Sequence, residues 1–450
     1  MNGSFGYVSG RPGSAIDEAR FSPNAVTSAD GRFTLVFEGD SESPEGVLAA
    51  YAARGKRAIE ELRGGFALGL WDTTERTLLL ARDPIGIQSL YFATAPGKLA
   101  FATEVWTLAA QGFAEKRLSR RAIGSFLATG AVAEPDTILE GVSPLPPATI
   151  LTYRDGHARS ATYWELPIEP RSDVDPRDVE AALIEAALPP AAPPRAPDER
   201  EITEAIEALD QPSTSFLQAF RAAKSAREAA FADLGRSALF PAAERVLRFG
   251  ARLAAGRAVE LAYAALRCRR ASHLYTSLSF HWDPAEGPIW DESHLPLTIP
   301  EKLGPALARR RIRLDRALST LDLVNALRDT ALRDADVASR RLGFALRAPL
   351  LERAVVESAL SLPLASTFRH TRARPAPAPP LAAWLRGPLR AWAEALLLDE
   401  LPRRAPFLSQ GFAEFLWPFF LRNDNNHRAA PNVFALATLV AYLQSHDATI

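Results

Sequence analysis

The sequence has almost no sulfur and almost no net charge. Its 450 residues include one cysteine, Cys268, and one methionine, Met1, so it predicts neither a disulfide framework nor a cysteine-based metal site. The formal net charge of −1 argues against a general nucleic-acid partner or an anionic membrane partner. No apolar run reaches the roughly 18 residues of a membrane helix, and no signal peptide opens the chain. We therefore expect a cytoplasmic protein whose partners include no nucleic acid and no membrane.

The length and composition predict an ordinary globular protein. At 450 residues, two domains are expected, each with enough residues for its own core. The hydrophobic fraction of 47% is typical of that class. Proline is enriched, at about 8% of the chain against an average near 5%. Two proline-rich runs lie at 189–197 and 375–380.

The most informative stretch runs from residue 62 to residue 104. It contains four short apolar runs, each closed by turn residues, which predict successive antiparallel strands. Residues 73–76 predict a hairpin loop, and Pro96 with Gly97 predicts a turn. The first runs are nearly all apolar instead of alternating, so both faces of their sheet are expected to be covered. A sheet packed on a second sheet and covered by helices would satisfy this pattern.

Three segments of this stretch contain recognisable sequence motifs. They read LRGGFALGLWD at 62–72, LLLARDPIGIQSLYF at 78–92 and LAFATE at 99–104. In wording and spacing they resemble the glutaminase domain of glutamine-dependent asparagine synthetases. The resemblance implies an α/β protein that opens with a glutaminase-like domain of the αββα N-terminal-nucleophile fold. A truncated, mostly helical synthetase domain of the adenine-nucleotide α-hydrolase-like type is then expected.

The resemblance also divides the chain. Residues 1–166 are expected to form the glutaminase-like domain, and 167–207 a proline-rich linker with a remnant of the nucleotide-binding half. Residues 208–450 are expected to form a degenerate asparagine-synthase-like helical domain. Helices are predicted at 105–111, 120–129, 178–188 and 432–444.

The family's glutaminase nucleophile is a cysteine that methionine removal exposes at the second position. Asn2 stands there and has no nucleophilic atom. Cleavage after Gly3 would instead free Ser4, but we expect an inert amino terminus.

Other glutaminase positions are altered as well. The family's oxyanion-hole asparagine corresponds to Glu38, and an ionised carboxylate cannot donate a hydrogen bond to a developing negative charge. The family's aspartate that binds the glutamine ammonium falls at Ser43. The positions that the resemblance marks as vestigial are Asn2, Arg20, Asn24, Glu38, Gly39 and Asp40.

The synthetase half of the family binds ATP and magnesium. Its Ser-Gly-Gly-Leu-Asp-Ser loop surrounds the pyrophosphate with backbone N–H groups. The present chain reads PPAAPPRAP over 189–197 instead, and proline has no N–H to donate. The family's pocket glutamate corresponds to Ala345. We therefore expect no cofactor and no metal, and the vestigial synthetase positions are Asp233, Gly235, Arg347 and Arg374.

Three segments have no counterpart role in the family. Cys268 is expected to be a small buried residue. The aromatic and acidic segment 277–296 is interpreted as a surface loop or partner-facing flap, with a metal or peptide site as the alternative. The basic run 309–313 is interpreted as a solvated helix face, with an anionic partner as the alternative.

Three hypotheses about function follow. The first is a non-catalytic asparagine synthetase homologue that is a scaffold or regulatory partner of an active paralogue or biosynthetic enzyme. The second is an ATP-dependent amide ligase that does not use glutamine. The third is a small-molecule binding module in the vestigial glutaminase cleft. Homodimer formation is left open.

Overall fold

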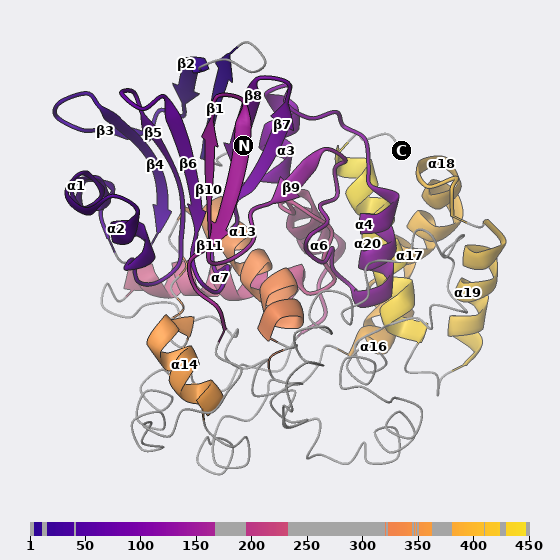
Figure 1. The fold of residues 1–450 in the computed structure, drawn as a ribbon. Coiled ribbons are helices and arrows are strands. Elements are labelled where there is room, and N and C mark those ends of the chain that lie inside the picture. The colour runs from indigo at the N-terminus through magenta and orange to yellow at the C-terminus, as the bar shows by residue number, and fades with distance from the viewer. Residues whose placement is uncertain are drawn as a thin grey trace.

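A computed structural model describes a β-rich amino-terminal part and a helical remainder that pack against each other (Figure 1). The described residues are 4–10, 16–39, 42–166, 195–232, 320, 323–343, 346, 348, 351–361, 380–408, 410–423 and 429–446.

The β-rich part contains two antiparallel sheets. The first has the strand order β2-β1-β8-β7-β9 and the second β11-β10-β6-β5-β4-β3. The strands of the first sheet are β1 (Phe5–Gly10), β2 (Ile16–Phe21), β7 (Tyr91–Ala95), β8 (Lys98–Ala102) and β9 (Val142–Pro144). Those of the second are β3 (Val26–Thr27), β4 (Phe33–Gly39), β5 (Phe66–Asp72), β6 (Thr77–Arg82), β10 (Thr149–Arg154) and β11 (His157–Thr162).

Three apolar clusters show how the layers stack. One joins Val8 and Phe101 of the first sheet to Trp71 and Leu80 of the second, so it fills the space between the sheets. Another covers the outer face of the second sheet with α1 (Pro44–Arg54) and α2 (Lys56–Glu60). The third covers the outer face of the first sheet with α3 (Val105–Ala110) and α4 (Arg120–Thr129). The order is therefore helix, sheet, sheet, helix.

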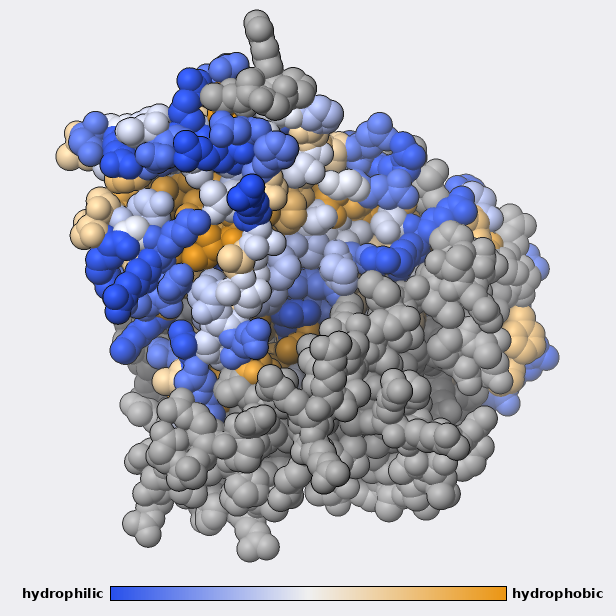
Figure 2. Space-filling model, viewed as in Figure 1, coloured by the Kyte–Doolittle hydropathy of each residue, from blue (hydrophilic) through white to orange (hydrophobic). Residues whose placement is uncertain are grey.

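The surface of the β-rich part is correspondingly polar. Figure 2 shows hydrophilic side chains over most of its visible face, with apolar colour confined to small patches between them. The apolar side chains of its strands pack between the layers. Every residue of β5, for example, is buried.

The predictions for residues 62–104 are confirmed. The four apolar runs form β5, β6, β7 and β8, the loop lies at 73–76, and the turn lies at 96–97. The four strands make two hairpins that belong to different sheets. The predicted helices at 105–111, 120–129 and 432–444 correspond to α3, α4 and α20, whereas 178–188 lies outside the described residues.

A buried charged turn follows β6. Asp83 accepts hydrogen bonds from four backbone N–H groups, which replace the water that its buried carboxylate has lost. Arg82 donates to the carbonyl oxygen of Leu145 at 2.8 Å and to Glu134 Oε1 at 2.7 Å. The four donors to Asp83 are the amides of Ile85, Gly86, Ile87 and Gln88, at 2.7–3.0 Å.

The remainder of the described chain is helical. Its α20 crosses the core, with twelve buried residues among its eighteen. Its elements are α6 (Glu199–Glu207), α7 (Phe216–Ala232), η2 (Leu323–Leu332), α13 (Arg333–Leu342), α14 (Arg353–Ser361), α16 (Leu381–Arg386), α17 (Arg390–Glu394), η4 (Ala395–Glu400), α18 (Leu401–Arg404), α19 (Gln410–Arg422) and α20 (Ala429–His446). Among the residues described, no helix has both the length and the apolar character needed to cross a membrane.

The packing between the sheets leaves no room at Gly69. A Cβ atom added there would lie 2.1 Å from the ring of Phe101. We predict that Gly69→Ala lowers the free energy of unfolding by about 1–3 kcal/mol in urea denaturation, because the ring must move in a packed core. Gly46→Ala is the control, since Gly46 is exposed in α1 and its nearest atom would be 3.3 Å away. Equal stability of the two variants would contradict this packing.

Candidate functional site

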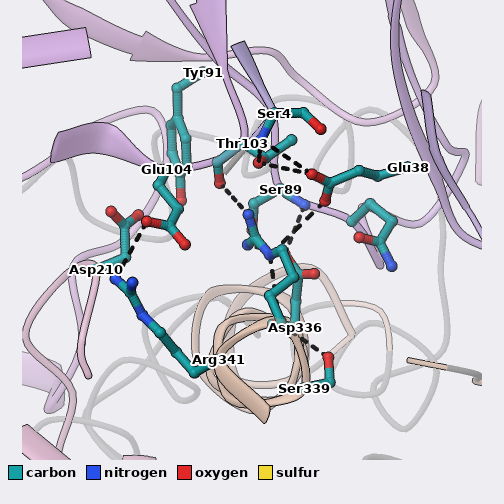
Figure 3. Close-up of polar contacts among 12 residues, drawn as sticks. Ser4, Glu38, Ser89, Tyr91, Thr103, Glu104, Asp210, Asp336, Ser339 and Arg341 are labelled. Carbon is teal, nitrogen blue, oxygen red and sulfur yellow. Dashed lines mark hydrogen bonds and ion pairs between the residues drawn. The ribbon is translucent and has the colours of Figure 1, made fainter. Parts of the chain in front are cut away.

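Glu38 and Ser4 meet at one end of the two sheets (Figure 3). Ser4 directly precedes β1, Glu38 lies near the end of β4, and Thr103 directly follows β8. The Ser4 N–H donates to Glu38 Oε1 at 3.2 Å and to Thr103 Oγ1 at 3.1 Å. The Thr103 hydroxyl donates to the same Glu38 oxygen at 3.2 Å. The Glu38 carboxylate is therefore engaged by groups of the chain itself.

Asn24, which lies between β2 and β3, also contacts Ser4. Its Nδ2 donates to Ser4 Oγ at 2.8 Å, and its Oδ1 accepts from Ser22 Oγ at 2.5 Å. Ser22 Oγ also accepts from the Phe5 N–H at 3.3 Å. Two of the predicted positions, Asn24 and Glu38, thus come together around Ser4, which is buried.

Arg20 does not join this cluster. In the β1–β2 ladder Arg20 is opposite Tyr7, whereas Phe21 is opposite Gly6 and packs into the core between the sheets. Successive residues of a strand point to opposite faces, so Arg20 faces outward. There it pairs with Glu18 at 2.8 Å and borders a surface pocket of about 620 Å³.

The remaining predicted positions divide into two groups. Gly39 is the last residue of β4, and Ser43 caps α1 by accepting a hydrogen bond from the Gly46 N–H at 3.1 Å. Several positions and segments lie outside the described residues: Asn2, Asp40, Asp233, Cys268, Gly235, Ala345, Arg347, Arg374, 277–296 and 309–313.

Arg340 of α13 connects the Glu38 cluster to the helical part. Its guanidinium donates to the Thr103 carbonyl oxygen at 2.8 Å and to Asp336 Oδ2 at 2.7 Å, and lies 3.9 Å from Glu38 Oε2. Asp336 also accepts from the Ser89 N–H at 3.0 Å. Burial raises the pKa of Asp336 to about 6, a rise that Arg340 opposes and Glu38 increases.

A second buried cluster lies beside the first. Glu104, which precedes α3, accepts from Arg341 at 3.2 Å, and Asp210 accepts from the Val105 N–H at 2.8 Å. The Tyr442 hydroxyl of α20 donates to the Asp210 carbonyl oxygen at 2.9 Å. These contacts again join the β-rich part to the helices.

Sequence reasoning missed the residues that complete these clusters. Arg340 and Asp336 lie in RDADVASRRL, a run so rich in charge that its composition is typical of a solvated helix. The helix is nevertheless buried over its first seven residues. No local signal in the sequence distinguishes a buried charged helix from an exposed one, because its partners lie in distant segments.

The contacts of Ser4 bear on what chemistry this cluster could support. Ser4 Oγ accepts a hydrogen bond from Asn24, and within the described residues no carboxylate or imidazole contacts that hydroxyl to activate it. Among the residues that the structure describes, no group of three or more His, Cys, Asp or Glu side chains could hold a metal ion.

Comparison with known sequences identifies the two parts. A profile of the glutamine amidotransferase domain matches residues 26–164, and a profile of asparagine synthase matches residues 220–377. These matches define a protein with an amidotransferase-type domain and a synthase-type domain in one chain. Together with the named relatives, the two matches support the asparagine synthetase family. They confirm the predicted resemblance, and the strands and helices confirm the α/β class with a layered amino-terminal part.

Several relatives are similar over the amino-terminal part. A Mycobacterium tuberculosis protein provisionally named asparagine synthetase (glutamine-hydrolysing) is 36% identical over 133 residues, which cover 29% of this chain and 19% of that protein. Asparagine synthetase 1 of Bacillus subtilis is 31% identical over 155 residues, with 33% and 24% covered. Amidase chyE of Penicillium rubens is 33% identical over 145 residues, with 32% and 21% covered. The matches thus span about a fifth to a quarter of the length of these relatives.

One solved structure is also similar. Glutamine phosphoribosylpyrophosphate amidotransferase of Bacillus subtilis, complexed with ADP and GMP, matches 42% of this chain and 52% of its own chain. The sequence identity is 11% and the TM-score is 0.24.

The Arg340 contacts predict a pH-dependent loss of stability on truncation. Arg340→Met leaves Asp336 and Glu38 without their cation, so we expect the free energy of unfolding to fall by about 3 kcal/mol at pH 8. Because Asp336 has a raised pKa in the folded state, its protonation at pH 5 removes a buried charge and the loss becomes smaller. Urea denaturation at both pH values measures this.

The control for this prediction is Arg57→Met. Arg57 is exposed and pairs with Glu61 at 3.0 Å. Exposed pairs contribute little, so this variant should match the wild type at pH 5 and at pH 8. An Arg340→Met protein as stable as the wild type at pH 8 would show that the buried contacts carry no net energy.

Proposed function

We propose that the chain is a non-catalytic member of its family, a cytoplasmic scaffold or regulatory partner of an active paralogue or biosynthetic enzyme. The observation that carries this proposal is the state of Glu38. Its carboxylate accepts from Ser4 and Thr103 and faces Arg340. At the position that the resemblance assigns to an oxyanion donor, an ionised carboxylate would repel the negative charge of a tetrahedral intermediate.

The neighbouring side chains support the same proposal. Asn24 donates its amide to Ser4, and Ser43 is a helix cap where the family has a substrate-binding aspartate. Both residues therefore have structural tasks. The proline run at 189–197, which offers few amide donors to a pyrophosphate, argues in the same direction for the second half of the chain.

An ATP-dependent amide ligase that does not use glutamine is the second candidate. The asparagine synthase match over residues 220–377 favours it. Arg347 and Arg374 lie within that match, and arginine is a good phosphate ligand. A binding module in the vestigial cleft is less favoured, because Ser4 is buried and its hydroxyl is already bonded by Asn24.

Glutamine hydrolysis tests the first proposal directly. The purified full chain, given glutamine, should release no more ammonia than a blank, while an active asparagine synthetase assayed in parallel releases it. Ser4→Ala should leave that background unchanged. Ammonia release that Ser4→Ala abolishes would identify Ser4 as a nucleophile and refute the proposal.

The two candidates differ in their response to ATP. A scaffold should give no heat of binding with ATP and magnesium in calorimetry and no pyrophosphate when carboxylates and amines are added. It should also co-elute with an active family member from the same organism in size-exclusion chromatography. ATP binding together with pyrophosphate release would establish the ligase instead.

A further inference from the structure

Two buried carboxyl groups from different parts of the chain lie side by side (Figure 3). Glu104 precedes α3 in the β-rich part, and Asp210 follows α6 in the helical part; both side chains are almost wholly inaccessible to solvent. One oxygen of each is bonded, Glu104 Oε2 to Arg341 and Asp210 Oδ1 to the Val105 N–H. Among the described residues, Glu104 Oε1 and Asp210 Oδ2 have no hydrogen-bond partner.

The positive charges around the pair do not cancel the repulsion that two ionised carboxylates would have. Arg340 is already engaged by Asp336 and the Thr103 carbonyl, so within the described part of the chain Arg341 is the arginine that hydrogen-bonds the pair. Two adjacent buried carboxylates cannot both remain ionised at low cost, whereas one proton between them satisfies both free oxygens. Among the described residues, the charged or titratable groups that interact with Asp210 are Arg340 and Arg341 from α13, Tyr91 from β7 and Tyr442 from α20. Arg333 and His446 interact in turn with Tyr442.

We propose that a proton on Asp210 bridges its buried carboxyl group and that of Glu104, and that loss of this proton loosens the contact between the β-rich part and the helices. The loosening comes from repulsion between the two buried carboxylates once the proton is lost. The Val105 N–H bond to Asp210 and the Arg341 bond to Glu104 favour the ionised groups and offset only part of that repulsion. The Tyr442 bond to the Asp210 carbonyl depends on the same segment. The contact between the β-rich part and the helices is thus tight in slightly acidic conditions and looser in alkaline ones.

The direction follows from linkage. Burial raises the pKa of Asp210 to about 7, and Glu104 increases the rise while Arg340 and Arg341 oppose it. The ordinary value of 3.8 applies to the unfolded chain. The contribution of the shared proton is therefore complete below that value and is lost as the pH rises through 7. His446 has the opposite sign, because burial lowers its pKa and its contribution is lost as the pH falls.

Asp210→Asn isolates the effect of the pair from that of His446. The asparagine keeps an acceptor for the Val105 N–H and supplies a donor to Glu104 Oε1 in place of the proton. At pH 8 we expect this variant to unfold about 2 °C above the wild type. At pH 5.5, which lies between the ordinary and the raised pKa of Asp210, the gain should be smaller. In hydrogen–deuterium exchange at pH 8, the peptide that contains α3 should exchange about threefold more slowly in the variant than in the wild type.

Glu207→Gln is the matched control. Glu207 is exposed at the end of α6, three positions before Asp210, so this variant should behave as the wild type at both pH values. Glu104→Gln is the second variant, because its amide oxygen still accepts from Arg341 and its amide nitrogen can donate to Asp210. A gain that is larger at pH 8 than at pH 5.5 in either substitution supports the shared proton. An equal gain at both pH values, or no gain in either variant, overturns it.

Discussion

Arg340 is the residue on which the arrangement of the two parts depends. A buried guanidinium must be matched by acceptors, and an uncompensated one costs several kcal/mol, on the order of 3–5. Its acceptors come from β4, from the end of β8 and from its own helix. These segments can supply them only when α13 lies against the ends of both sheets. One side chain thereby fixes the position of a helix relative to two layers of strands.

Other ionic contacts across the same boundary follow this principle. Glu134 binds Arg82 of β6 at 2.7 Å and lies 3.4 Å from Arg328 of η2. Arg333 donates to the Val132 carbonyl oxygen at 2.6 Å. Since hydrogen bonds to charged groups are directional as well as strong, such contacts select one orientation of the helices, which apolar packing alone does not.

The sequence predicted the strands of the β-rich part because their apolar runs are a local property. It predicted that β5 is covered on both faces for the same reason. It could not assign the two hairpins to separate sheets, since that depends on pairing with β1 and β10 far along the chain. It also grouped Arg20 with Asn24 and Glu38, although strand parity places Arg20 on the other face. Thr103, Asp336 and Arg340 were missed because their roles arise only from contacts between distant segments.

The turn at Asp83 explains why the most recognisable sequence motif of this chain, at 78–92, gives little information about catalysis. Asp83 and Arg82 are buried, and their charges are satisfied by amides, carbonyls and Glu134 of the same molecule. Both side chains have a structural role that requires no substrate. Replacing either one would leave buried polar groups without hydrogen-bond partners. Selection for folding alone would preserve such a motif. Its occurrence therefore reports on the fold, and the motif would persist whether or not the chain catalyses a reaction.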